Sequence, residues 1–373
     1  MVYVNPSISQ TKRVFPEQGR REFLRLDMNE NVDGLPKDFV EEVRKEITSD
    51  FLSAYPEAIR FEEVYAGYLG NGAKKENVLS TNGSDMAIRY ILETFGERGK
   101  DVVTVTPSFE MYRINCSLLG LRHKSVNYET DLTIDVQKIL DAITEDTRIV
   151  VLLNPNNPIG NVYAEEEMRR IIEKAVEVEA LVVIDEAYYY YYPNSFWELA
   201  LCYEHVLVLR TFSKLFSMAA CRLGVVIGSQ RLLNEIRKMR VSFDVNSIAL
   251  LFGERIIRRP DIIRELIRME KEGKQYLLGE LNKNGYEYLA GEGNYIFIRP
   301  KREPRDIERR LRGEGVLVHT LNHPLIQMYV RVSTASRPVM SRFMDCFLAI
   351  DNGEAGGPND VDGSNMGDIG GQG

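Results

Sequence analysis

The chain has 373 residues, of which 44% are hydrophobic and 27% are charged, and its formal net charge is −8 at pH 7. A chain of this length can bury a large core and form two domains. The acidic balance argues against a nucleic-acid partner, and no apolar run approaches the roughly 18 residues that would span a membrane.

The start of the chain and its cysteines indicate a compartment. The first thirty residues include basic residues but no hydrophobic region, so we expect no secretory signal. The four cysteines, Cys116, Cys202, Cys221 and Cys346, show no paired spacing. Reduced thiols in a cytoplasm fit this pattern better than a disulfide framework does. We therefore expect a cytoplasmic protein.

Gly83 lies in a polar segment, residues 81–85, directly before apolar residues at helical spacing, namely Met86, Ile88, Ile91 and Leu92. This pattern predicts a glycine turn that leads into a helix. Unpaired N–H groups and the helix dipole favour an anion at such a start. A plain helix start would give the same pattern.

Five short apolar runs are typical of strands that are buried on both faces of a sheet. They are residues 102–105, 149–153, 181–184, 206–209 and 225–227. Between the second and third runs, residues 165–179 place apolar side chains on one helical face. This β-α-β arrangement predicts an α/β fold with a mostly parallel central sheet flanked by helices. A helix at residues 261–281 and a strand at residues 295–298 are predicted beyond it.

Several residues with cofactor chemistry follow these runs. Asp185 ends the third run, so we expect it at the carboxyl edge of a buried strand, where open α/β sheets bind ligands. Lys214 follows Thr211 and Ser213, and Arg222 comes shortly after. Together they supply an amine, phosphate donors and an acid for a ring nitrogen. These are the groups that a protein offers to pyridoxal phosphate, whose ring acts as an electron sink.

Lys214 is the predicted Schiff-base residue, and its ammonium must lose a proton before it reacts. Desolvation and a nearby cation such as Arg222 assist that loss. Thr211, Ser213 and Arg222 are expected to surround the phosphate, and Asp185 to keep the pyridine nitrogen protonated. Taken singly, Lys214 could be a surface lysine and Asp185 a helix cap.

A turn at residues 154–160 follows the second run and contains two prolines and a glycine, an irregular turn at a strand end. We expect the amide of Asn157 to reach the ring hydroxyl of the cofactor, with Tyr188 as a second donor. An ordinary loop is the alternative interpretation of this turn.

Jointly, these segments resemble the fold-type-I pyridoxal-phosphate enzymes, and specifically the histidinol-phosphate aminotransferase family. The resemblance covers roughly residues 10 to 350, and the motifs occur in the order that the family shows. The matching segments are residues 26–31, 55–56, 82–85, 107–112, 154–160, 185–188 and 211–214 with Arg222, and residues 331–333.

The resemblance implies further cofactor contacts. Ser84 and Asp85 would lie under the phosphate, and Phe109 would stack on the pyridine face. The family's assembly would be a homodimer, in which Tyr55 reaches the phosphate of the neighbouring subunit.

The resemblance also implies substrate contacts and catalytic roles. Arg331 would bind the anionic group of the substrate, and Asn29 would also contact the substrate. The catalytic residues would be Lys214, Asp185 and Tyr188.

The domain organisation implied by the resemblance has four parts. Residues 46–257 would form the large cofactor-binding domain. Residues 1–45, an amino-terminal arm, and residues 258–350 would form the smaller α+β domain. Residues 351–373 contain five acidic residues, no Lys or Arg and many glycines, so we expect a disordered tail.

Departures from the family pattern concern the substrate. His319 stands where the family has a second arginine, and Pro16-Glu17 stands where it tends to have Pro-Tyr. Each lost charge-assisted contact weakens a dianion site by about 1.5–3 kcal/mol. We therefore expect histidinol phosphate to be a poor substrate. A plain surface loop position remains an equal interpretation of His319.

The sequence thus predicts an aminotransferase that moves an amino group between an amino acid, or related amine, and a 2-oxo acid. Two alternatives stay open: a decarboxylase like threonine-phosphate decarboxylase, which shares these motifs, and a non-catalytic protein that binds pyridoxal phosphate. His319 and His323 have the spacing of helical metal ligands, but Pro324 argues against a helix, so no metal is expected.

Overall fold

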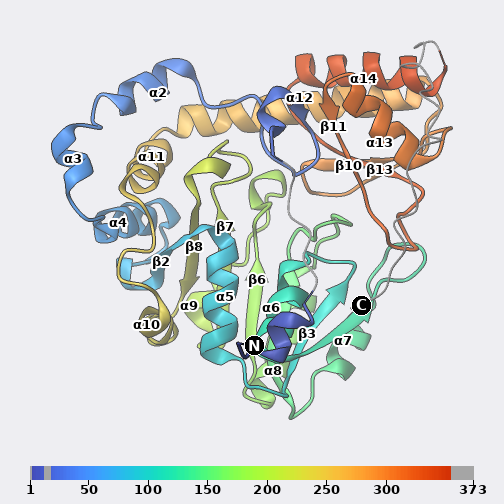
Figure 1. The fold of residues 1–373 in the computed structure, drawn as a ribbon. Helices are drawn as coiled ribbons and strands as arrows, with labels where there is room; N and C mark the ends of the chain where they lie inside the picture. The colour runs from blue at the N-terminus through green and yellow to red at the C-terminus, as the bar shows by residue number, and fades with distance from the viewer. Residues whose placement is uncertain (1, 12–17, 354–373) are drawn as a thin grey trace.

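The structure is a computed structural model that describes residues 2–11 and 18–353. Its centre is a seven-stranded sheet with the order β2-β8-β7-β6-β5-β3-β4 (Figure 1). The strands are β2 (Val78–Asn82), β3 (Asp101–Thr106), β4 (Arg122–Asn127), β5 (Thr147–Leu153), β6 (Leu181–Asp185), β7 (Val206–Thr211) and β8 (Leu223–Gly228). β8 runs antiparallel to its two neighbours, β2 and β7, and the other neighbouring pairs of this sheet are parallel.

Helices cover both faces of this sheet, which is why its strands are continuously apolar. Alternate residues of a strand face opposite sides, so Val182 and Val183 in β6 enter two different cores. One core includes α4 (Ala58–Leu69), α7 (Val136–Ala142), α8 (Glu165–Glu177), α9 (Leu199–Cys202) and α11 (Ser247–Ile257). The other includes α5 (Gly83–Phe95), α6 (Met111–Leu119) and α10 (Gln230–Met239).

A second, antiparallel sheet has the order β12-β13-β10-β9. Its strands are β9 (Tyr288–Ala290), β10 (Tyr295–Ile298), β12 (His319–Thr320) and β13 (Val330–Ser333). One face packs on α12 (Pro260–Lys283), α13 (Pro304–Gly313) and α14 (Arg337–Asp351) in a separate core. The long α12 runs from beside α11 across to this smaller unit (Figure 1).

The amino-terminal segment joins the smaller unit through β1 (Leu24–Arg25), which pairs in parallel with β11 (Val316–Leu317). The remaining helices are short. They are α1 (Pro6–Ser9), α2 (Lys37–Arg44), α3 (Ser49–Ser53) and the 3-10 turns η1 (Arg20–Glu22), η2 (Lys75–Asn77), η3 (Tyr189–Tyr191) and η4 (Ala219–Cys221).

The predicted fold class is confirmed, since the sheet is mostly parallel and flanked by helices. Each predicted apolar run lies within a strand, and the predicted helices are α5, α8 and α12. The helix α8 ends at Glu177, shortly before the predicted end, and Glu179 has a left-handed φ of 56° that a helix cannot continue. Within the described residues, no helix has both the length and the apolar character needed to cross a membrane.

The predicted boundary of the tail needs a correction. Asp351 is the last residue of α14 and is buried. Its carboxylate accepts hydrogen bonds from the Tyr286 hydroxyl at 2.8 Å and from the N–H groups of Lys301 at 2.9 Å and Arg302 at 3.0 Å. Residues 354–373 lie outside the described residues, as do Pro16 and Glu17. The division of the chain into domains stays a prediction.

Candidate active site

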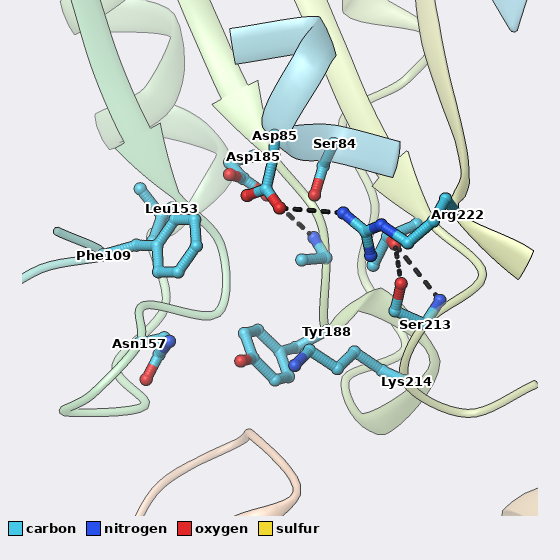
Figure 2. A pocket seen from close by; sticks show the side chains of 12 residues that line it. Ser84, Asp85, Phe109, Leu153, Asn157, Asp185, Tyr188, Ser213, Lys214 and Arg222 are labelled. Carbon is cyan, nitrogen blue, oxygen red and sulfur yellow. Dashed lines mark hydrogen bonds and ion pairs between the residues drawn. The ribbon is translucent and has the colours of Figure 1, made fainter. Parts of the chain in front are cut away.

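A pocket lies at the carboxyl ends of the central strands, where Leu153, Asp185 and Thr211 end β5, β6 and β7. The parallel strands bring these positions to one edge of the sheet. All predicted cofactor contacts except Tyr55 line this pocket (Figure 2): Ser84, Asp85, Phe109, Asn157, Asp185, Tyr188, Thr211, Ser213, Lys214 and Arg222.

Asp185 is a buried acid held in one orientation. One carboxylate oxygen accepts a hydrogen bond from the Tyr112 hydroxyl at 2.8 Å, and the other accepts from the Ala187 N–H at 3.1 Å. Burial raises the pKa of Asp185 to about 6, and these hydrogen bonds oppose that rise. The carboxylate is therefore charged near pH 7, and both of its hydrogen-bond donors are neutral groups, which suits it to a protonated ring nitrogen.

Lys214 enters the same pocket from the loop after β7 (Figure 2). Its amine donates a hydrogen bond to the carbonyl oxygen of Met28 at 2.8 Å and lies 5.7 Å from the centre of the Tyr188 ring. The predicted pair of amine and acid, Lys214 and Asp185, thus lines one cavity. Met28 was not foreseen, because a contact through a backbone carbonyl leaves no trace in the residue type.

The start of α5 forms the anion-binding end of the pocket. Gly83 begins this helix with a φ of 71°, and a Cβ atom there would lie 2.6 Å from Arg222 Nη2. Arg222 Nη2 donates to Asp85 Oδ2 at 2.8 Å. Because a carboxylate repels a phosphate, Asp85 can serve a phosphate here by orienting Arg222. Ser84 lies in the same first turn.

Two hydroxyls face the start of α5 from the end of β7. The N–H of Ser213 donates to Thr211 Oγ1 at 3.1 Å, and the Thr211 hydroxyl donates to Ser213 Oγ at 3.1 Å. Both side chains line the same pocket as the start of α5, where backbone N–H groups favour an anion.

Arg331 does not line the pocket itself but contacts Asn157, which does. Arg331 Nη1 donates to Asn157 Oδ1 at 3.2 Å, so the amide nitrogen of Asn157 remains available to the pocket. Arg331 Nη2 donates to the Asp27 carbonyl oxygen at 2.6 Å, and Arg331 Nε has no hydrogen-bond partner within the described residues. Burial lowers the pKa of Arg331. A buried guanidinium with an unused donor is suited to a carboxylate ligand.

His319 lies next to Arg331, as its cross-strand neighbour in β12. Partial burial and the Arg331 charge lower the pKa of His319 to about 4, so the imidazole is neutral near pH 7. His319 does not line the pocket, and its Nδ1 lies 3.9 Å from Glu308 Oε1. His323 lies outside any helix, so the two histidines do not have helical spacing.

Two predicted site residues occupy other places. The side chain of Asn29 is buried against Tyr188 and Ser333 and does not line the pocket, and its predicted substrate contact stays a prediction. Tyr55 is 74% exposed and stacks on Phe243, with ring centres 4.2 Å apart. Its predicted role in a neighbouring subunit stays a prediction.

Tyr112 was also missed as a site residue, although it ends the matching segment 107–112. It lies in the first turn of α6, and burial raises the pKa of its hydroxyl well above the usual value. It therefore remains a hydrogen-bond donor to Asp185. The sequence offers no spacing rule that joins these two residues.

The residues of the pocket fit pyridoxal phosphate. The start of α5, Arg222 and Ser213 provide donors at one end, and Asp185 provides a buried carboxylate. The aromatic side chain of Phe109 lies on one wall, and the Asn157 amide and Tyr188 hydroxyl lie along another (Figure 2). Lys214 supplies the amine.

Comparisons of the sequence agree with this site. Residues 21–344 match the family described as "Aminotransferase class I and II". The histidinol-phosphate aminotransferase of Clostridium novyi is 30% identical over 338 residues, which cover 90% of this chain and 93% of that protein. The enzyme of the same name from Geobacillus is 31% identical and covers 91% of this chain and 92% of its own.

Solved structures share the fold. Histidinol-phosphate aminotransferase from Sinorhizobium meliloti, in complex with pyridoxal-5'-phosphate, has a TM-score of 0.84 at 22% identity and covers 95% of this chain and 99% of its own. Aspartate aminotransferase from Thermus thermophilus with maleate has a TM-score of 0.75 at 20% identity and covers 94% of this chain and 100% of its own.

Proposed function

This chain belongs to the class I and II aminotransferase family, and from this we infer the role of each residue in the pocket. The predicted resemblance to histidinol-phosphate aminotransferases is confirmed. The chain is a pyridoxal-phosphate-dependent transaminase, and the amino group passes between an amino acid, or related amine, and a 2-oxo acid. The substrate and the roles of individual residues are our proposal.

When bound, pyridoxal phosphate supplies an electron sink for the carbanion that forms at the substrate's α carbon. Asp185 keeps the ring nitrogen protonated, and its rigid contacts with Tyr112 and Ala187 hold it in place. Lys214 Nζ would take the proton from the substrate's α carbon as general base and, as general acid, would deliver it to the cofactor carbon bonded to the transferred nitrogen, C4′. Asn157 and Tyr188 donate to the ring oxygen.

Arg331 binds the substrate carboxylate. Two observations support this role: Arg331 Nε has no hydrogen-bond partner among the described residues, and Arg331 contacts Asn157, which lines the pocket. His319 next to it is neutral at pH 7, so this pair of residues offers one positive charge. A monoanionic carboxylate fits one guanidinium better than a phosphate dianion does. We therefore propose that histidinol phosphate is a poor substrate.

The assembly is a homodimer in the cytoplasm, with Tyr55 of each subunit completing the phosphate site of the other. The exposed aromatic stack of Tyr55 on Phe243 supports this proposal, since exposed apolar side chains in contact with one another are typical of interfaces. The four unpaired cysteines fit a reducing compartment.

The observation that carries the proposal is that Lys214 and Asp185 line one pocket. Lys214→Ala is expected to abolish both the visible absorbance of covalently attached pyridoxal phosphate and turnover with every amino donor in a panel. Lys238→Ala is the matched control, because Lys238 is an exposed lysine paired with Glu235. Full turnover by Lys214→Ala, or equal loss in the control, would overturn the assignment. The same panel identifies the amino donor.

A further inference from the structure

Three consecutive residues of the amino-terminal segment each contact a different residue of the active site. The Asp27 carbonyl accepts from Arg331 Nη2 at 2.6 Å, and the Met28 carbonyl accepts from Lys214 Nζ at 2.8 Å. The Asn29 amide donates to the Tyr188 hydroxyl at 2.9 Å. Residues 27–29 therefore contact the three residues to which we assign substrate binding, proton transfer and the ring contact: Arg331, Lys214 and Tyr188.

This segment is held firmly by the smaller unit. The N–H of Leu26 donates to the Leu317 carbonyl at 2.8 Å, and the Leu26 carbonyl accepts from the Ser333 N–H at 2.9 Å. Asn294 Nδ2 donates to the Asn29 carbonyl at 3.2 Å. The position of Asn29 is thus set by β11, β13 and the start of β10.

Asn29 is also oriented by its hydrogen bonds. Its backbone N–H donates to Ser333 Oγ at 2.8 Å, and the single hydroxyl proton of Ser333 then points to Asn29 Oδ1 at 3.2 Å. The remaining NH₂ end of the amide faces Tyr188. A flipped amide would leave the Ser333 proton without an acceptor in a site where Ser333 is fully buried.

The orientation of Asn29 decides where the Tyr188 proton goes. A phenol has one proton to donate, and an oxygen that accepts from an amide N–H must direct that proton elsewhere. Figure 2 shows the Tyr188 hydroxyl turned toward the side of the pocket where Asn157 lies. We propose that Asn29 is a positioning residue, oriented by Ser333, that makes Tyr188 a hydrogen-bond donor to the cofactor's ring oxygen.

This inference rests on the proposed function, since it needs the ring oxygen beside Tyr188. It also accounts for the backbone of Asn29, whose φ is 57°. Asparagine and aspartate tolerate this left-handed conformation better than most residues. Asn29→Asp therefore keeps the backbone and the acceptor for Ser333, but it replaces the amide donor by a second acceptor. In that variant the Tyr188 proton turns toward the introduced carboxylate and away from the pocket.

The test is a double-mutant cycle on the affinity of the apo-protein for pyridoxal phosphate, measured by fluorescence. Asn29→Asp and Tyr188→Phe are each expected to weaken binding by about tenfold, because each removes the same charge-assisted donor. In the Tyr188→Phe background, Asn29→Asp is expected to change the affinity less than about twofold. Both single variants should shift the pH at which the bound cofactor changes its visible absorbance in the same direction.

Several outcomes are decisive. Wild-type affinity in Asn29→Asp overturns the inference. So does an equal loss of affinity from Asn29→Asp with and without Tyr188→Phe, because the carboxylate introduced at position 29 would then weaken binding without acting through Tyr188. If Asn29→Asp does not fold, Ser333→Ala is read in the same cycle, because it frees the amide to flip. A Tyr188→Phe variant with wild-type affinity and absorbance would also overturn the inference, since Tyr188 would then not donate to the ring oxygen. The proposed function fails separately, if Lys214→Ala keeps full turnover.

Discussion

At the scale of single residues, Asp185 at the end of β6 should make the free energy of unfolding depend on pH. Burial raises the pKa of Asp185 to about 6 from an unfolded value of 3.8. Its contribution to the free energy of unfolding is therefore complete below about pH 4 and falls by up to roughly 3 kcal/mol as the pH rises through 6. Asp185→Asn does not titrate and lacks this dependence.

Urea unfolding of the two apo-proteins between pH 4 and pH 7.5 checks this expectation. The free energy of unfolding of wild type, minus that of Asp185→Asn, should decrease as the pH rises through this window. Other carboxylates titrate in both proteins and cancel in the difference. A difference that stays constant with pH would show that Asp185 is not a desolvated acid.

A second residue-scale prediction concerns His319. His319→Arg places a second guanidinium beside Arg331, its cross-strand neighbour. We expect kcat/KM for histidinol phosphate to rise by about tenfold or more, because a charge-assisted contact contributes roughly 1.5–3 kcal/mol. His323→Arg is the control, since it adds the same charge outside β12. An equal gain in the control would point to general attraction, and no gain in His319→Arg would place His319 away from the substrate.

At the scale of an element, the start of α5 depends on Gly83. Gly83 and Gly99 both have a positive φ, of 71° and 79°, but only at Gly83 would a Cβ atom meet Arg222, at 2.6 Å. Gly83→Ala and Gly99→Ala should therefore share a backbone penalty of roughly 1–2 kcal/mol. We expect Gly83→Ala alone to weaken pyridoxal-phosphate binding, by about tenfold or more, since it displaces a charge-assisted donor.

Thermal unfolding of the apo-proteins and titration with pyridoxal phosphate separate the two effects. Similar losses of thermal stability with unequal affinities support the phosphate site at α5. If Gly99→Ala weakens binding as much as Gly83→Ala does, the loss comes from general destabilisation.

Also at the scale of elements, the sequence predicts some strands of the central sheet but not others. The central strands were found because helices cover both faces, so residues 149–153 and 181–184 are continuously apolar. β4 was missed because it is an edge strand with mostly exposed or half-buried residues, and β2 ends in three polar ones. The reversed direction of β8 was not foreseen either, because an apolar run gives no direction.

For the candidate site, the sequence predicts residues that belong to local motifs, but not the contacts between segments that are far apart in the chain. Lys214, Asp185 and Asn157 carry their chemistry in their residue type and in their place after a strand. Asn29 was placed at the substrate, yet its partners Tyr188 and Ser333 are 159 and 304 positions away in sequence. Only the three-dimensional arrangement shows that its amide is already used, and that Met28 contributes through its backbone.

At the scale of the whole molecule, Tyr55 lies between α3 and α4 in the chain, and its stacking partner Phe243 lies between α10 and α11. These helices lie on one side of the molecule (Figure 1). If Tyr55 completes the neighbouring subunit's site, two inactive variants should rescue each other. In a heterodimer of Lys214→Ala and Tyr55→Ala, one of the two sites has both residues intact. Random pairing should restore about a quarter of wild-type turnover.

Co-expression with two affinity tags allows the heterodimer to be isolated, and it should then show about half of wild-type turnover, because one of its two sites is intact. The control pairs Lys214→Ala with Asp185→Ala, two residues that line the same pocket of one chain. That heterodimer has no intact site and should stay inactive, because each subunit carries one defect in its own pocket. Rescue in the control would mean that Lys214 and Asp185 come from different subunits. An inactive first pair, or a protein that is monomeric by light scattering, would exclude Tyr55 from the neighbouring site.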